Sequence, residues 1–215
     1  MIFSLTNTQF TFIFPKQKMF QNCFLLFLTY FLVLTASTSG MESLGAASIS
    51  RATIDLLDGA RANDLGMVQT AIEQNAEINF NMTVARQTAL MISSLHGFTD
   101  IVTHLLDQPT IDIHVIEKDG YTCLDGSSYQ GRAPIVTALL RAGADPNVKH
   151  EDGYYPLHRA CWGKEARHEE AVLALLNGGA NLKQKASSGQ TCLDINPLLR
   201  PTLQKFLHDK PKKKT

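Results

Sequence analysis

The fold is decided by the stretch DGYTCLDGSSYQGRAPIVTALLRAGADPN, which occupies residues 119–147. Its first half begins with Asp119-Gly120, which is typical of a loop. Small and apolar residues follow at the spacing of a short helix. Its second half sets Ile135-Val136 and Leu139-Leu140 in the stripe of a second helix. Gly143 follows, where a helix commonly ends in a left-handed conformation. The stretch therefore predicts a helix, a tight turn, a second helix and an extended loop.

The same pattern recurs with a period close to 33 residues. Its four-residue landmark starts at residues 88, 122, 155 and 191, so successive starts are 34, 33 and 36 residues apart. The four versions are Thr88-Ala89-Leu90-Met91, Thr122-Cys123-Leu124-Asp125, Tyr155-Pro156-Leu157-His158 and Thr191-Cys192-Leu193-Asp194. The second-helix stripe and the turn recur in phase with it. Because one helix pair cannot bury both of its stripes, neighbouring units must stack.

These landmarks resemble the ankyrin-repeat family, whose pattern runs D-G-x-T-P-L-H-x-A-A-x-x-G-H and then I-V-x-x-L-L-x-x-G-A-D-x-N. The resemblance implies an all-α solenoid of stacked helix-turn-helix units with finger loops. It covers about five units within residues 50–208, and the first and last units depart most from the pattern. Such end units are expected, because one face of each meets water. Residues 209–215 are assigned to a basic tail.

Residues 1–40 differ from the repeats and are predicted to be a signal peptide. Lys16 and Lys18 precede an apolar run over residues 23–34, and small residues follow it up to Gly40. This order is typical of a secretory leader, and the run is shorter than the roughly 20 residues of a membrane-spanning helix. The protein is then expected in the secretory pathway or outside the cell. Two alternatives stay open: a retained membrane anchor, or a cytoplasmic protein translated from Met41.

Asn81 is a predicted glycosylation site, because Asn81-Met82-Thr83 forms the acceptor sequon. The sequon has meaning only in the secretory route. A tripeptide of this kind also occurs often by chance, so it does not itself decide the compartment.

Composition argues against nucleic acid as a partner and against catalysis. The chain has 20 Lys and Arg against 20 Asp and Glu, so it has no surplus positive charge for binding phosphates. It contains no nucleophile elbow, phosphate-binding loop, dinucleotide fingerprint or H-E-x-x-H motif. We therefore assign no catalytic residue and no cofactor. No metal site is assigned, because His158 and Cys161 fill ordinary positions of the repeat. We expect a non-enzymatic monomer.

Three of the four cysteines belong to the repeats, at positions 123, 161 and 192. We interpret all three as small buried apolar side chains. Cys123 and Cys192 hold the same repeat position but stand two units apart, which is too far for a disulfide. Since an odd number of thiols cannot all pair, this count weakens the case for an oxidising compartment.

The resemblance implies that a protein partner meets the finger loops and the concave face lined by first helices. Trp162 stands five positions after the leucine of the packing stripe, about 140° around the helix. Tyr129 and Leu95 hold the same position in the two preceding units, while Tyr121 and Tyr154 share a second position just before the landmark. We predict that these five residues bind the partner. The alternative at the residue level is that the rings pack on one another, and at the level of function it is a structural or vestigial domain with no dedicated partner.

The fourth unit carries about three extra residues between its helices, from Gly163 to His168. Loops tolerate insertions at low cost, which favours a neutral surface insertion. A specificity element is the alternative.

Overall fold

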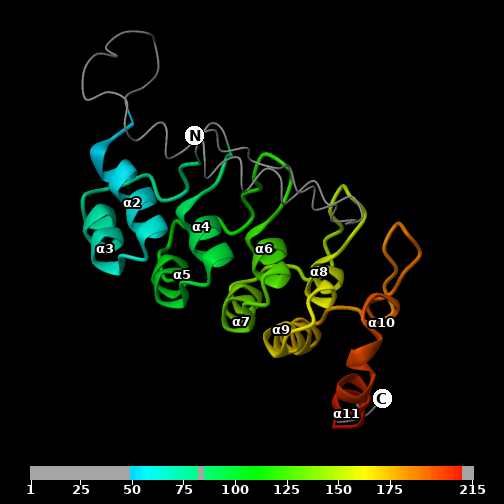
Figure 1. Cartoon of the computed structure of the whole chain (residues 1–215). Helices are drawn as coiled ribbons and strands as arrows, with labels where there is room; N and C mark the ends of the chain where they lie inside the picture. Colours follow the sequence, from blue (N-terminus) through cyan, green and yellow to red (C-terminus); the bar gives the residue numbers. More distant parts are fainter. Residues whose placement is uncertain (1–48, 82–84, 210–215) are drawn as a thin grey trace, which may run out of the picture. The chain divides into compact units, whose positions relative to one another are not determined.

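The computed structural model describes residues 49–81 and 85–209. These residues form ten α-helices and one 3-10 helix, and within them there is no strand. Successive helix pairs lie beside one another in chain order, with long loops between the pairs (Figure 1). The pairs are α2 (Arg51–Ala62) with α3 (Leu65–Glu73), α4 (Ala89–His96) with α5 (Thr99–Leu106), α6 (Cys123–Tyr129) with α7 (Ala133–Arg141), and α8 (Pro156–Trp162) with α9 (Ala166–Asn177), followed by α10 (Cys192–Ile195), η1 (Pro197–Leu199) and α11 (Arg200–Asp209). The predicted all-α repeat fold is confirmed, whereas the predicted signal peptide lies outside the described residues.

The landmark residues begin the first helix of the second to fifth units. The hydroxyls of Thr88, Thr122 and Thr191 each accept a hydrogen bond from the backbone N–H three residues ahead. In α6 and α10 an aspartate at that third position accepts the threonine N–H in return, which completes a capping box. The corresponding helix α8 has Pro156 at its first position, where the fixed φ of proline suits the first turn.

The core runs along the stack, between first and second helices and between units. Leu139 in α7 and Leu175 in α9 hold equivalent positions, and neither has exposed surface. Ser127 and Ser128 of α6 are also fully buried, as their small-residue positions predict. These short side chains let the helices of a unit approach closely, so the register derived from the sequence is confirmed.

Two asparagines tie neighbouring units together through their turns. Asn79 and Asn147 each use both ends of the side-chain amide to bond backbone of the next unit, at residues 110–112 and 179–181, over 2.7–3.1 Å. The equivalent position between the second and third units is His114. Among the described residues, the His114 side chain makes no such bridge.

The fifth unit is the least regular. Its first helix, α10, has four residues, of which Cys192 alone is buried. In η1 and α11 the buried side chains are Leu199 and Leu203. Leu198 is 75% exposed and Leu207 is 56% exposed. The C-terminal unit therefore rests on its neighbour through few apolar side chains.

Candidate partner-binding site

Arg159 lies in the middle of α8, and its guanidinium is buried between two carboxylates. Its Nε donates to Oδ1 of Asp125 in α6 at 3.1 Å, and one terminal nitrogen donates to both oxygens of Asp152 at 3.0 and 3.1 Å. The Arg159 side chain is 1% exposed. A buried cation needs such partners, because its desolvation is otherwise very costly. The ion pairs thus join two first helices and the finger loop between them.

Two aromatic rings cover the guanidinium. The ring centroids of Tyr121 and Trp162 lie 4.5 and 5.6 Å from Cζ of Arg159. Tyr121 also stacks on the imidazole of His150, with 4.0 Å between centroids and 4° between ring planes. Cation–π attraction is strengthened where the cation is desolvated, as it is for Arg159.

Trp162 brings two more rings into contact. Its ring meets Tyr154 edge to face at 4.9 Å and 63°, and it meets Tyr129 at 6.1 Å and 77°. Aromatic pairs favour such geometries over flat stacking. We call Tyr121, Tyr129, Tyr154, Arg159 and Trp162 the aromatic–arginine cluster. Its four aromatic side chains are half-buried, so each contacts the stack and keeps an accessible part.

Four of the five predicted partner-binding residues are therefore brought together. Their rings also contact one another, as the alternative interpretation expected, and partner binding by them stays a prediction. Leu95 is half-buried one unit away, beside Gly126 of α6, and lies outside the cluster. Asn81 is half-buried in the described part of its loop, whereas the remainder of its sequon is outside the described residues.

The surroundings of Asp152 favour its charged form. Burial opposes ionisation of Asp152, but Arg159 and the N–H of Tyr154 outweigh burial and lower the pKa of this carboxyl. Burial raises the pKa of Tyr121, and Asp152 adds to this effect while Arg159 opposes it. The Tyr121 hydroxyl is consequently a neutral donor and acceptor.

Sequence reasoning missed Arg159 and its two aspartates. Arg159 occupies a position that the repeat pattern leaves free, so the pattern itself gives no reason to expect burial. A signal was nevertheless present: Arg159 stands between His158 and Ala160, both of which the pattern places inward, and a charged residue there needs an acidic partner.

His158 is fully buried beside the next finger. The backbone of Gln184 and of Gln190 approaches its ring, but neither ring nitrogen makes a hydrogen bond of good geometry to the described residues. Burial lowers the pKa of His158, so the neutral imidazole is favoured. The ring of His158 is thus held between neighbouring units by packing, with loose polar contacts to the backbone of the next finger.

The insertion in the fourth unit is anchored to the third unit. His168, in the first turn of α9, is 6% exposed, and its Nε2 lies 3.2 Å from the carbonyl oxygen of Tyr129. Its ring packs so closely on Gly163 that a Cβ there would lie 2.0 Å from Cδ2. The insertion is therefore a fixed element beside the cluster. Its part in specificity stays a prediction.

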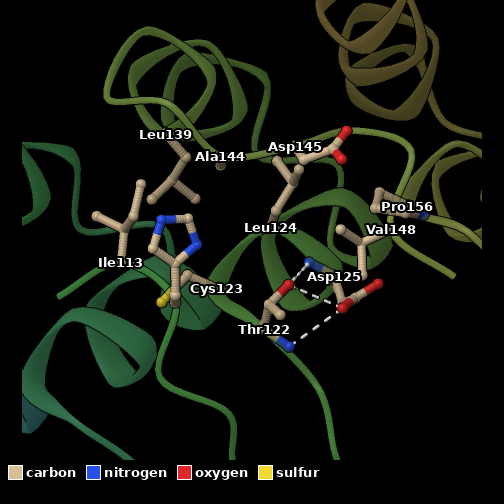
Figure 2. Close-up of a pocket in the computed structure, with 11 residues that line it drawn as sticks. Ile113, Thr122, Cys123, Leu124, Asp125, Leu139, Ala144, Asp145, Val148 and Pro156 are labelled. Atoms are coloured by element: carbon tan, nitrogen blue, oxygen red, sulfur yellow. Dashed lines mark hydrogen bonds between the residues drawn. The ribbon is translucent and has the colours of Figure 1, made fainter. Parts of the chain in front are cut away.

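A small cavity lies on the other side of α6, between this helix, α7 and the adjoining fingers (Figure 2). Its volume is about 50 Å³, and Cys123, Leu124 and Leu139 are among its lining residues. Figure 2 also shows the capping bonds between Thr122 and Asp125 at its edge. Sites for small molecules generally have volumes of ~300–1,000 Å³, so this cavity has room for a few waters only.

The interpretation of all three repeat cysteines as small apolar side chains is wrong for two of them. Cys161 and Cys192 form a disulfide, with 5.6 Å between their Cα atoms. The pairing arises because the end of α8 lies against the start of α10 in the next unit. For Cys123 the interpretation is right: this thiol is free and buried, and burial raises its pKa to about 12.

Comparison with known proteins places this architecture in a family. A model of three ankyrin repeats matches residues 56–150, and a model of a single ankyrin repeat matches residues 152–187. The chain belongs to the ankyrin-repeat family. Ankyrin repeats are protein–protein interaction modules, and this is the class of protein that the stack defines.

Three relatives illustrate the range of proteins that carry such repeats. BCL-6 corepressor-like protein 1 of Homo sapiens is 30% identical over 125 residues, covering 58% of this chain and 7% of that protein. Protein phosphatase 1 regulatory subunit 12A of Mus musculus is 35% identical over 79 residues, covering 36% and 7%. Palmitoyltransferase AKR1 of Lachancea kluyveri is 24% identical over 169 residues, covering 62% and 22%. The chain spans less than a quarter of the length of each.

Two further observations concern the described residues alone. None of their helices combines the length and the apolar character that crossing a bilayer requires. Nor do they gather three His, Cys, Asp or Glu side chains in an arrangement suited to a metal ion.

Proposed function

We propose that this chain is a non-enzymatic binding module that holds a protein partner on the first helices and fingers of its third and fourth units. The observation that carries the proposal is the aromatic–arginine cluster. Tyrosine, tryptophan and arginine are the side chains most enriched at interface hot spots. Here the buried ion pairs of Arg159 hold its guanidinium in place, and the rings of Tyr121 and Trp162 pack on that guanidinium. Rings held in this way lose little side-chain entropy when a partner covers them.

The charge of the repeats supports a protein partner over a nucleic acid. Six of the 20 basic residues lie outside residues 49–209, at positions 16, 18, 210, 212, 213 and 214, and only Glu42 of the 20 acidic residues does. Residues 49–209 therefore carry 14 basic and 19 acidic side chains, a formal charge of −5. A surface of this sign repels phosphate backbones.

The proposal is tested by comparing Trp162→Ala with Glu170→Ala, which alters an exposed residue of the second helix α9. Wild type and both variants are used to capture proteins from the native source, and quantitative mass spectrometry compares the captured sets. We expect one partner to be lost with Trp162→Ala and kept with Glu170→Ala. Truncation of the tryptophan should weaken its binding by about 2 kcal/mol or more, or roughly thirtyfold in Kd.

Thermal unfolding of the same variants separates binding from folding. A lost partner with an unchanged melting temperature supports the proposed face. A retained partner with a large drop in melting temperature would show that Trp162 acts only as a core side chain. Equal capture by all three proteins would favour a structural domain with no dedicated partner.

For the compartment, we propose maturation in the secretory pathway. The Cys161–Cys192 disulfide supports this proposal, because such bonds persist in oxidising compartments. It also removes the difficulty of an odd number of thiols, since the remaining Cys123 is buried. N-terminal sequencing of the native protein should give a start near Ser39 to Met41, and peptide mapping should find glycan on Asn81. A start at Met1, or an unglycosylated chain beginning at Met41, would contradict it.

A further inference from the structure

The Cys161–Cys192 disulfide joins the least regular unit to its neighbour. Cys161 lies near the end of α8 and Cys192 begins α10, and both side chains are fully buried. Cys192 is also the one residue of α10 that is buried. The covalent bond thus joins α8 to α10, two helices that are neighbours in Figure 1.

Apart from the disulfide, the fifth unit is held by buried Leu199 and Leu203, by partly buried apolar side chains beside them, and by hydrogen bonds. The side-chain amide of Asn196 donates to the carbonyl oxygen of Gly163 at 3.0 Å, and the hydroxyl of Thr202 donates to a carboxylate oxygen of Glu169 at 2.5 Å. In α8, by contrast, six of seven residues are buried, against one of four in α10. Repeat units are stabilised by their intrinsic folding and by their neighbours, and an end unit has one neighbour only. The non-covalent docking of this unit is therefore weaker than that of the inner units.

The other units dock without such a bond at the same place. The positions equivalent to Cys161 and Cys192 are held by Ser94 and Cys123 between the second and third units, and by Ser128 and Pro156 between the third and fourth. The second, third and fourth units each have a neighbour on both sides. The covalent bond thus occurs at the interface of the C-terminal end unit, which has a neighbour on one side only.

We propose that the disulfide is a redox clasp for the C-terminal unit. Oxidised, it holds α10, η1 and α11 on α8; reduced, it lets this unit undock while α2 to α9 stay folded. Reduction requires a dithiol. One thiolate attacks a cysteine sulfur and forms a mixed disulfide, and the second thiol closes the reductant into its own disulfide. Two electrons and two protons pass to the protein, so Cys161 and Cys192 both become thiols.

Burial determines when the clasp opens. Because neither sulfur has exposed surface, a reductant reaches them only after the fifth unit has opened locally. The disulfide is thus protected from reduction while the fifth unit is docked, and it can be reduced when this unit unfolds locally. The reduced unit then redocks with a lower equilibrium constant, since the loop between the cysteines is no longer closed.

Hydrogen exchange of the full chain, read by mass spectrometry, tests the clasp. The folded oxidised protein is compared with the same protein treated with dithiothreitol. In the reduced protein we expect residues 192–209 to exchange roughly tenfold faster or more. Residues 123–141 should keep their protection. Equal protection of residues 192–209 in both states would overturn the proposal, as would loss of protection in every unit at once.

Two variants sharpen the comparison. Cys161→Ala with Cys192→Ala should resemble the reduced protein with and without dithiothreitol, whereas Cys123→Ala should respond to the reductant as wild type does. If the double variant fails to fold, the wild type reduced after folding decides the question alone. Non-reducing peptide mapping of the native protein must also find Cys161 linked to Cys192. Two unlinked thiols at these positions would contradict the clasp.

Discussion

Nε of Arg159 lies 3.1 Å from Oδ1 of Asp125, although the two residues are 34 positions apart and belong to different units. Both side chains are almost fully buried. Asp125 has a second task, because its other carboxylate oxygen accepts the N–H and hydroxyl of Thr122 at the start of α6. One carboxylate thus caps a helix and neutralises a cation of the next unit.

Removing this carboxylate should destabilise the stack strongly. We expect Asp125→Ala to lower the free energy of unfolding by about 3 kcal/mol, because it leaves a buried guanidinium with Asp152 as its remaining acidic partner. Asp194→Ala is the matched control, since Asp194 completes the same capping box in α10. Urea denaturation of both variants measures the difference. Equal losses would mean that the cap, and not the ion pair, carries the effect.

The second helices should be sensitive to loss of their equivalent leucines. Leu139→Ala and Leu175→Ala each remove a side chain with no exposed surface and should cost about 2–5 kcal/mol of unfolding free energy. Leu198→Ala, at a position that is 75% exposed, should change it by less than about 0.5 kcal/mol. Urea denaturation of the three variants tests this. Unchanged midpoints for the first two would contradict the position of the core.

The repeat made these core positions predictable, whereas pairing between units was harder to foresee. Leu139 and Leu175 follow from period and helical stripe alone. The disulfide does not follow from them. Cys123 and Cys192 hold the same repeat position, but they stand two units apart and cannot pair. In the stack, however, the end of one first helix contacts the start of the first helix in the next unit. Cys161 and Cys192 meet in this way, although they are 31 residues apart in the sequence. Arg159 was missed because its repeat position accepts many residue types.

The same relationship predicts that a second disulfide can be built. Ser94 and Cys123 occupy the positions of Cys161 and Cys192 two units earlier, and both side chains are buried. Ser94→Cys should therefore pair with Cys123 and raise stability by about 2–4 kcal/mol. Thiol counting under denaturing conditions should find no free thiol in residues 49–209. One control is Ser128→Cys: the position that corresponds to Cys192 is Pro156 at this interface, so two free thiols should remain.

Two buried histidines should make stability depend on mildly acidic pH. Burial lowers the pKa of His158 and of His168 in the folded protein, while the unfolded value lies near ~6.5. The unfolded chain then binds more protons, so their contribution to stability is complete above about pH 6.5 and falls as the pH drops toward the folded values. Urea midpoints at about pH 7.5 and about pH 5.5 should show this decrease.

Two substitutions test whether His158 causes this pH dependence. His158→Gln should make the decrease smaller, whatever its effect on stability at neutral pH. His114→Gln changes an exposed histidine and should leave the decrease as in wild type. An identical pH dependence in wild type and His158→Gln would exclude His158 as its source.

The asparagine bridges are distributed unevenly along the stack. Asn79 and Asn147 fasten the turns of the first two units to each other and those of the third and fourth units to each other. At the seam between the second and third units, His114 stands in their place without a bridge among the described residues. The fingers at this seam are joined, because the N–H of Lys118 donates to the carbonyl oxygen of Ala85 and the side-chain amide of Gln87 donates to the Glu117 carboxylate. We therefore expect the second and third units to separate more readily at their turns than at their fingers.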